Sequence, residues 1–279
     1  MNPLLQSDEI KLNHIGLQSP NPQRLANFYQ DVLAMTAHSQ GNNEWLCEGS
    51  DRTILISMGK RNEFEFAAFS STNFDKISSL KERVKSFGFN ANDYHSTLLK
   101  PGAFYVIDPD KRKICFGTPI ARLTSEKGLH GPLQHVTFRS KCVESFEKFY
   151  NEILNFKVVD QVVNTSGKIT ASFLTSNQEH HTIACFKASE TSLDHHSYEV
   201  GKWNLIRDWC DFFSKKGVRV LWGPGRHGPG NNLFVFIEDL DGNRIELSAE
   251  LESPMNRQKK VWPHEEKTLN LWGKAIMRI

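Results

Sequence analysis

Imidazole and carboxylate side chains, which bind transition metals, recur on short apolar segments in the second half of the chain. His135 lies in one alternating segment, the pair His195 and His196 in another, and Glu246 between two apolar residues in a third. Two imidazoles and one carboxylate on one face form the ligand set of non-haem Fe(II), with positions left open for substrate and dioxygen. A buried carboxylate without a partner costs several kcal/mol. One histidine alone is more often structural than a ligand, but the three segments together predict a metal site.

An internal repeat indicates which elements position these residues. The segment 12–33 reads LNHIGLQSPNPQRLANFYQDVL, and the segment 133–154 reads LQHVTFRSKCVESFEKFYNEIL. Each begins with the alternation of a strand and continues with the apolar spacing of a helix. Further matches join residues 74–88 to 203–217, and residues 104–116 to 235–247. The residues that recur in the first pair of segments are Leu12, His14, Ser19, Phe28, Tyr29 and Leu33, as Leu133, His135, Ser140, Phe149, Tyr150 and Leu154.

The repeat predicts two copies of one strand–helix–strands unit, and therefore a fold of the α+β class. The first copy keeps His14, but it has Ala67 near the place of the histidine pair and Cys115 in the place of Glu246. We therefore expect the first copy to bind no metal and His14 to be structural. The expected parts are an N-terminal tail (residues 1–10), a first module without metal (11–122), a linker (123–131), a second, catalytic module (132–250) and a C-terminal segment (251–279).

Composition excludes several other classes of protein. The chain is 39% hydrophobic and 24% charged, as in ordinary globular domains. A net charge of +2 without a basic stripe argues against nucleic acid as a partner. Its apolar runs are far shorter than the roughly 20 residues of a membrane helix, and the first ten residues do not resemble a signal peptide. Five widely spaced cysteines without a CxxC motif favour a reduced, cytoplasmic protein.

Several motifs resemble those of the type I extradiol ring-cleavage dioxygenases of the vicinal oxygen chelate superfamily. They are GRHGPGNNLFVFIEDLDGNRIEL at 225–247, LQHVTF around His135, HHT at 180–182, DHH at 194–196 and the closing NLWG at 270–273. The resemblance covers nearly the whole chain. It implies tandem, paired βαβββ modules with curved, partly open mixed sheets, and a metal in the second module. It also implies a C-terminal segment over the active site, and homo-oligomers.

By position, the resemblance assigns a role to each candidate site residue. It implies that His135, His196 and Glu246 bind Fe(II), although manganese stays open. The family pattern favours His196 over His195, since neighbours on a strand point to opposite faces and do not both bind. His181 would be the acid–base residue. The residues expected to contact the substrate are His227, also placed in the catalytic set, with His195, Trp222 and Phe236.

The implied activity is extradiol (meta) cleavage of a catechol-type ring, with a small aromatic diol and O2 as partners. Trp222 favours an uncharged, hydrophobic substrate. Phe236 stands where the family usually has a tyrosine, and a lost hydrogen bond to a charged oxygen costs about 1.5–3 kcal/mol, or roughly one to two decades in rate. Two alternatives stay open. One is another metal-dependent reaction on the same fold, such as a glyoxalase-like isomerase or lyase. The other is a non-catalytic ligand-binding protein, for which Phe236 is the support.

Overall fold

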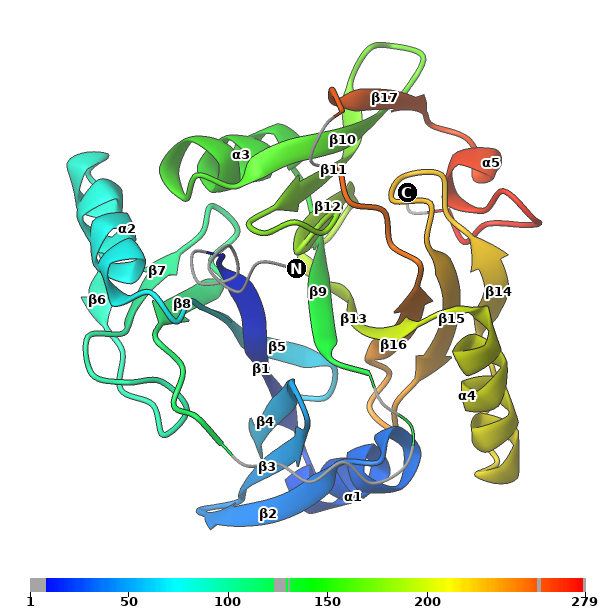
Figure 1. Cartoon of the computed structure of the whole chain (residues 1–279), viewed down its shortest axis with the longest axis horizontal. Coiled ribbons are helices and arrows are strands. Elements are labelled where there is room, and N and C mark those ends of the chain that lie inside the picture. The colour runs from blue at the N-terminus through cyan, green and yellow to red at the C-terminus, as the bar shows by residue number, and fades with distance from the viewer. Residues whose placement is uncertain (1–8, 123–128, 130, 255–256, 278–279) are drawn as a thin grey trace.

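The computed structural model describes residues 9–122, 129, 131–254 and 257–277, and in them the two copies of the repeat form two curved mixed sheets (Figure 1). The expected α+β class is confirmed. The first sheet has the order β2 (Thr36–Gly41), β3 (Glu44–Gly49), β4 (Arg52–Met58), β1 (Lys11–Ser19), β5 (Glu63–Ser70), β8 (Lys113–Gly117), β7 (Phe104–Ile107), β6 (Asn92–Asp93). The second has the order β14 (Trp222–Arg226), β15 (Leu233–Glu238), β16 (Arg244–Ala249), β13 (Ser192–Gly201), β9 (Leu133–Ser140), β12 (Ile183–Lys187), β11 (Ile169–Thr175), β10 (Lys157–Val163), β17 (Lys260–Pro263).

The two sheets share one topology around their first strands. In the first sheet β1 pairs in parallel with β4 and antiparallel with β5. In the second sheet β9 pairs in parallel with β12 and antiparallel with β13. The registers also correspond, because Ile15 pairs with Ala67 and Val136 with His196. The repeat in the sequence is therefore a repeat in the structure, and Ala67 occupies the position of His196.

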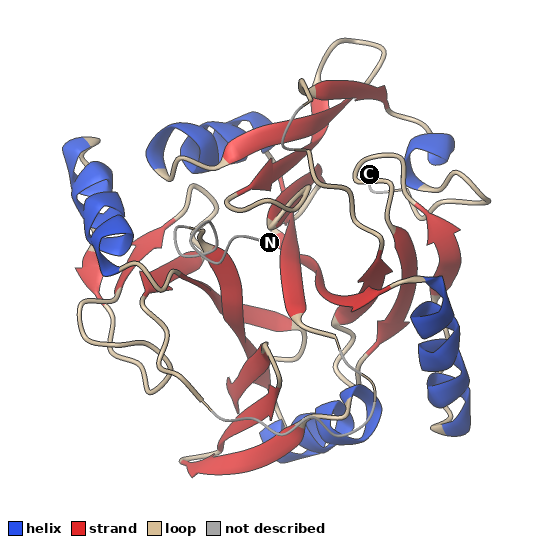
Figure 2. Ribbon diagram, viewed as in Figure 1, coloured by secondary structure: helices blue, strands red, loops and turns tan. Residues whose placement is uncertain are grey.

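The helices lie at the periphery of the view, outside the strands (Figure 2). They are α1 (Pro22–Leu33), α2 (Phe74–Ser86), α3 (Val143–Lys148), which continues into the π-helix η2 (Phe149–Ile153), α4 (Trp203–Lys215) and the short α5 (Glu266–Leu269). In α1, the Asn21 side chain accepts a hydrogen bond from the Arg24 amide, and Pro22 follows it in the first turn, as is common at helix starts. No helix in the described part of the chain is long and apolar enough to cross a membrane.

A reciprocal pair of tyrosines joins the two halves. Tyr29, on α1, donates a hydrogen bond to Asp239 in the β15–β16 turn of the second half, at 2.9 Å. Tyr150, its counterpart in the repeat, donates to Asp108 in the β7–β8 turn of the first half, at 3.2 Å. Both tyrosines are completely buried. A helical tyrosine of each copy therefore donates a hydrogen bond to the acidic turn of the other copy.

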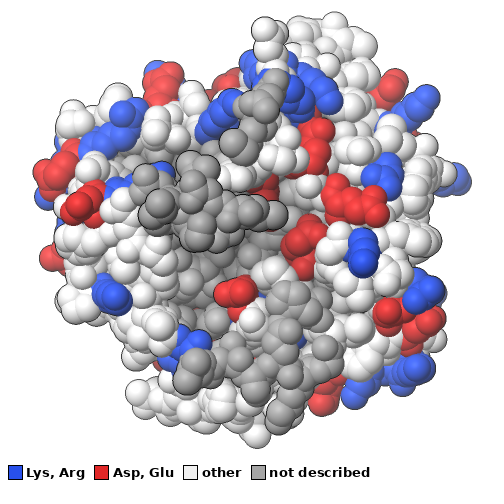
Figure 3. Space-filling view, viewed as in Figure 1, with Lys and Arg blue, Asp and Glu red and all other residues white. Residues whose placement is uncertain are grey.

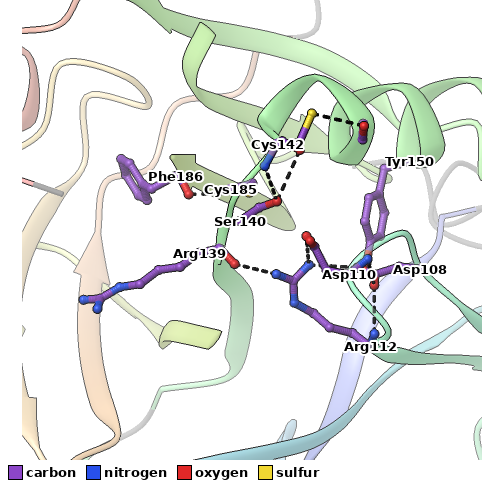
Figure 4. A network of polar contacts seen from close by, with 10 residues as sticks. Asp108, Asp110, Arg112, Arg139, Ser140, Cys142, Tyr150, Cys185 and Phe186 are labelled. Atoms are coloured by element: carbon purple, nitrogen blue, oxygen red, sulfur yellow. Dashed lines mark hydrogen bonds and ion pairs between the residues drawn. The ribbon is translucent and has the colours of Figure 1, made fainter. Parts of the chain in front are cut away.

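Arg112 extends the second of these contacts into a network (Figure 4). Its guanidinium lies 2.9 Å from carboxylate oxygens of both Asp108 and Asp110 and donates to the main-chain oxygen of Arg139, on β9. It also lies over the Phe138 ring, with the guanidinium carbon 4.4 Å from the ring centroid. The contact ties the first half to the strand that carries His135.

The C-terminal segment adds an edge strand and crosses the second sheet. β17 pairs in parallel with β10, and the Trp222 indole donates to the main-chain oxygen of Lys274 at 2.9 Å. In Figure 1 this segment lies beside β14 and β15. On the face that Figure 3 shows, Lys and Arg are interspersed with Asp and Glu.

Candidate metal centre

Strand register brings two histidines and a glutamate to one face of the second sheet. Ser197 on β13 pairs with His135 on β9 and with Glu246 on β16, so these three side chains share a face. Residues two apart on a strand also share a face, which adds His195. The nitrogen and oxygen atoms that His135, His195 and Glu246 offer to a metal lie within 4.8 Å of one another.

The expected ligand role of His196 is corrected by this register. His196 lies on the opposite face of β13, where its Nε2 is 3.2 Å from the Tyr29 hydroxyl and its ring packs against Tyr198. It is fully buried, and burial lowers its pKa to about 3, so it is a neutral part of the junction between the halves. His195, expected only to contact substrate, takes its place in the metal-binding cluster.

Glu246 is the centre of the cluster. One of its carboxylate oxygens lies 2.9 Å from His135 Nε2 and 3.4 Å from His195 Nε2, and the other lies 3.3 Å from His227 Nε2. Burial alone would raise the pKa of Glu246, but the three neighbouring imidazoles outweigh it and hold the pKa well below the usual range. The carboxylate is therefore ionised and available as a ligand.

Asp194 contacts the His195 ring, and Arg139 contacts Asp194. His195 Nδ1 is 2.7 Å from one Asp194 oxygen, and the Arg139 Nε donates to the other at 2.8 Å. Burial lowers the pKa of His195, but the bonds to Asp194 and Glu246 outweigh it and the pKa is raised. A carboxylate on one ring nitrogen of a ligating histidine fixes the tautomer and leaves the other nitrogen for the metal. The main-chain oxygen of Arg139 also accepts the hydrogen bond from the Arg112 guanidinium.

The donor set fits a divalent transition metal. Two imidazoles and a carboxylate on one side of an ion leave the opposite side open, as in the sites of non-haem Fe(II). Both ring nitrogens of His135 are buried without a hydrogen-bond partner of good geometry, although Nε2 lies beside the Glu246 carboxylate. Burial also lowers the pKa of His135, so the imidazole is neutral and has a lone pair to offer. A metal would satisfy this nitrogen.

A cavity of about 380 Å³ opens over the cluster. The described residues that line it are His135, Thr137, Phe173, His181, Phe186, His195, His227, Pro229, Phe236, Glu246 and Leu269. His181, His227 and Phe236, three of the expected site residues, are among them. Trp222 is not among the lining residues: it stacks on Phe236, with ring centroids 5.1 Å apart, and its N–H is bound by main chain. We correct its expected contact with substrate to support of Phe236.

Two histidines at the cavity have one ring nitrogen already engaged. His181 Nδ1 lies 3.0 Å from His180 Nδ1, and the His181 ring packs on His135 at 4.2 Å between centroids. Burial, followed by the proximity of the His135 imidazole, lowers the pKa of His181 well below its usual value. His227 directs Nδ1 to the Leu269 carbonyl oxygen in the C-terminal segment. In both rings Nε2 is the nitrogen left for the cavity or the cluster.

Several supporting residues had not been singled out from the sequence. Asp194 was visible as the first letter of the DHH motif, and Asn232, whose amide is 3.4 Å from a Glu246 oxygen and 3.0 Å from the Ser248 hydroxyl, closes the glycine-rich loop. Thr137, which lines the cavity, gave no signal, because nothing in its own segment marks it as a neighbour of the cluster.

A comparison with protein families matches the second half of the chain. The family model of the Glyoxalase/Bleomycin resistance protein/Dioxygenase superfamily matches residues 133–247, the stretch that carries all three residues of the cluster.

Particular relatives are extradiol dioxygenases. The chain is 28% identical to metapyrocatechase of Pseudomonas sp. (strain CF600) over 258 residues, which is 84% of each chain. It is 26% identical to metapyrocatechase 2 of Cupriavidus necator over 161 residues, or 56% of this chain and about half (49%) of that protein. Homoprotocatechuate 2,3-dioxygenase of Brevibacterium fuscum, solved with 3,4-dihydroxyphenylacetate, has the same fold: TM-score 0.81, 20% identity, covering 99% of this chain and 93% of that one.

Proposed function

We propose that this protein is an Fe(II)-dependent extradiol dioxygenase that opens the ring of an uncharged, hydrophobic catechol with O2. The observation that carries the proposal is the cluster of His135, His195 and Glu246 at the base of a largely aromatic cavity. The relatives named metapyrocatechase support the reaction type. Bound there, Fe(II) would hold the diol and dioxygen side by side and lower the pKa of the diol.

The cavity walls favour an uncharged substrate. The rings of Phe173, Phe186 and Phe236, with Leu269, form the apolar part of the lining, and none of the described lining residues is Lys or Arg. A substrate carboxylate would be buried there without a cationic partner, which is costly. The apolar walls also keep bulk water away from the ring while it reacts.

In the proposed reaction, a histidine accepts and returns a proton. His181 Nε2 would accept a proton from a diol hydroxyl as the substrate binds and return it to oxygen before the ring opens. A group that both gains and loses a proton in one cycle is well served by imidazole. His227 Nε2 lies near the Glu246 carboxylate oxygen that does not contact His135 or His195. It would therefore contact the substrate from the opposite side of the cluster.

Oxygen uptake by protein loaded anaerobically with Fe(II) tests the proposal. We expect uptake and a yellow ring-opened product with 4-methylcatechol and 3-phenylcatechol, and at least tenfold lower kcat/KM with 3,4-dihydroxyphenylacetate, whose carboxylate has no cationic partner in the cavity. Uptake that requires neither iron nor Glu246 would refute the assignment. Tight binding of catechols by iron-loaded protein without oxygen uptake would instead support the ligand-binding alternative, and bound iron with isomerase or lyase activity alone would support the glyoxalase-like one.

A further inference from the structure

A second group of polar side chains, partly or completely buried, lies beside His181 and outside the metal cluster. It consists of Asp160 on β10, His180, and three residues of the C-terminal segment: Glu252, Arg257 and Trp262. Asp160 and His180 are completely buried. His180 directly precedes His181, and its Nδ1 lies 3.0 Å from His181 Nδ1.

The Asp160 carboxylate contacts both His180 and the C-terminal segment. His180 Nε2 lies 3.1 Å from its Oδ2, and the Trp262 indole N–H donates to the same oxygen at 2.8 Å. Arg257 and the Lys260 main-chain amide donate to Oδ1 at 2.8 and 3.2 Å. These four contacts use the capacity of a carboxylate, about two acceptor sites per oxygen. Three of the four come from the C-terminal segment, so the carboxylate joins that segment to His180.

We propose that His180, held by Asp160, is a positioning residue for His181, and that Trp262 and Arg257 complete this support only when the C-terminal segment is docked. The proposal rests on the proposed function for the role of His181. The metal cluster and its cavity are thereby connected to the segment that covers them.

The direction of each hydrogen bond follows from the acceptor at its end. An ionised carboxylate only accepts, and Asp160 is ionised: burial alone would raise its pKa, but the bonds from His180 and Arg257 lower it. The hydrogen of the His180 ring is therefore assigned to Nε2, which lies 3.1 Å from this carboxylate, and Nδ1 is assigned the lone pair. That lone pair accepts from His181 Nδ1–H. His181 Nε2 is left with its lone pair for the cavity, the state that can accept a proton from a diol.

The same group of residues has a composition that could hold a cation, since the ligand atoms of Asp160, His180 and Glu252 lie within 4.8 Å of one another. Arg257, however, already contacts both carboxylates. Its guanidinium supplies positive charge to the buried Asp160 and the partly exposed Glu252, and a metal would have to displace it. The geometry therefore favours a hydrogen-bonded support over a second metal site.

Two substitutions at one position separate hydrogen bonding from packing. In His180→Asn the amide oxygen takes nearly the place of Nδ1 and keeps an acceptor for His181, whereas His180→Leu removes it. With Fe(II)-loaded protein we expect His180→Leu to lower kcat at least tenfold, with KM for the catechol and the iron content unchanged, and His180→Asn to recover most of the rate. Equal losses in both variants, or a full rate in His180→Leu, would overturn the proposal.

The link to the C-terminal segment has its own matched pair. Trp262→Phe keeps the ring and removes the N–H bond to Asp160. Lys259→Met removes a contact between the same two segments, from Lys259 to Gln161 at 2.9 Å, that does not reach His180. We expect a severalfold lower kcat in Trp262→Phe and no change in Lys259→Met. These milder variants also answer the question if His180→Leu does not fold. Equal rates in the two would show that the segment does not support His181.

A spectroscopic readout keeps this test independent of catalysis. In ¹⁵N-histidine spectra of protein loaded with diamagnetic Zn(II), we expect His181 to carry its hydrogen on Nδ1 in wild type and His180→Asn, and a mixture of tautomers in His180→Leu. If wild type shows this tautomer but consumes no oxygen with iron, the proposed function fails and the positioning stands. A hydrogen on Nε2 in wild type, or a second bound metal that Asp160→Asn loses, would overturn the positioning.

Discussion

Adjacent histidines on β13 have opposite surroundings. His195 Nε2 lies among the nitrogen and oxygen atoms of the metal cluster, while His196 lies at the junction with α1, 3.2 Å from the Tyr29 hydroxyl. On a strand, one position separates the cavity face from the core face. The two residues are therefore chemically alike and both buried, but they face different surroundings.

This pair gives a matched test of the ligand assignment. We expect His195→Ala to lose bound iron and oxygen uptake, because two protein ligands would be left. His196→Ala should keep the iron content and lose about 1–3 kcal/mol of unfolding free energy, since it leaves a void and removes one polar neighbour of the Tyr29 hydroxyl. Metal analysis and urea denaturation measure both. Iron lost from His196→Ala and kept in His195→Ala would reverse the assignment.

Position 236 has a phenylalanine where the family usually has a tyrosine, and we expect the tyrosine to raise activity. The ring lies 5.1 Å from the His195 ring, centroid to centroid, and lines the cavity. In Phe236→Tyr an added hydroxyl could donate to a substrate oxygen, and a hydrogen bond to a charged oxygen is worth about 1.5–3 kcal/mol. We expect kcat for a neutral catechol to rise by about one decade. A lower kcat with iron still bound would show that this cavity is shaped around phenylalanine.

His14, the counterpart of His135 in the first half, predicts a pH dependence of stability. Its Nε2 is buried without a hydrogen-bond partner, and burial lowers its pKa from 6.5 to about 3. Between these values the unfolded chain binds a proton that the folded one does not, so stability falls as pH drops below 6.5. His14→Leu should remove about 1.4 kcal/mol per pH unit from that slope, measured by urea denaturation from pH 6.5 to 4. An unchanged slope would contradict the buried, neutral state.

At this scale the sequence predicted residue types better than it predicted which face each residue occupies. Six of the eight candidate residues line the cavity, namely His135, His181, His195, His227, Phe236 and Glu246. His196 was preferred by family pattern, and the strand's own alternation argued otherwise: Tyr198 and Val200 belong to the hydrophobic core, so His196 belongs with them. A register shift between Leu193 and His195 breaks that alternation upstream, which no local pattern reveals.

Among elements, the helices at the junction between the halves are the most informative. Tyr29 on α1 and Tyr150 on η2 are equivalent in the repeat, and each donates to an acidic turn of the other half. The repeat predicted the paired strands and helices because both copies have the same apolar periodicity. It could not predict that the copies exchange contacts, since a donor and its acceptor lie far apart in the chain and each has its own repeat partner.

Replacing either tyrosine by phenylalanine tests whether these contacts between the two halves stabilise the fold. Tyr29→Phe and Tyr150→Phe should each cost about 1.5–3 kcal/mol of unfolding free energy, because each removes a hydrogen bond to a buried carboxylate. The two tyrosines donate to different carboxylates, so the costs should add in the double variant. Tyr105→Phe, a half-buried tyrosine of β7, is the control and should change stability by less than about 0.5 kcal/mol. Wild-type stability in either buried variant would show that the tyrosines merely fill space.

In the whole molecule, one hydrophobic core runs through both halves. The same cluster of buried residues contains Ile15 and Phe69 from the first half and Val136 and Ile245 from the second. Across the junction, the ring of Phe64 packs on that of Phe138 at 4.9 Å between centroids. Smaller clusters belong to one half each, but this shared core joins the described parts of both halves. We therefore expect the halves to unfold together, although only the second would hold metal.

Metal binding should accordingly protect the first half, which does not touch the ion. A ligand that binds only the folded state adds about 2.7 kcal/mol of stability at a hundredfold excess over its Kd. If unfolding is one cooperative step, that increment reaches every amide whose exchange requires global unfolding. We expect hydrogen exchange to slow equally in β5 and in β13 when Fe(II) is added anaerobically. His135→Ala should show neither effect. Protection confined to β13 and its neighbours would mean that the halves open independently, and that the tyrosine exchange joins them too weakly to transmit metal binding.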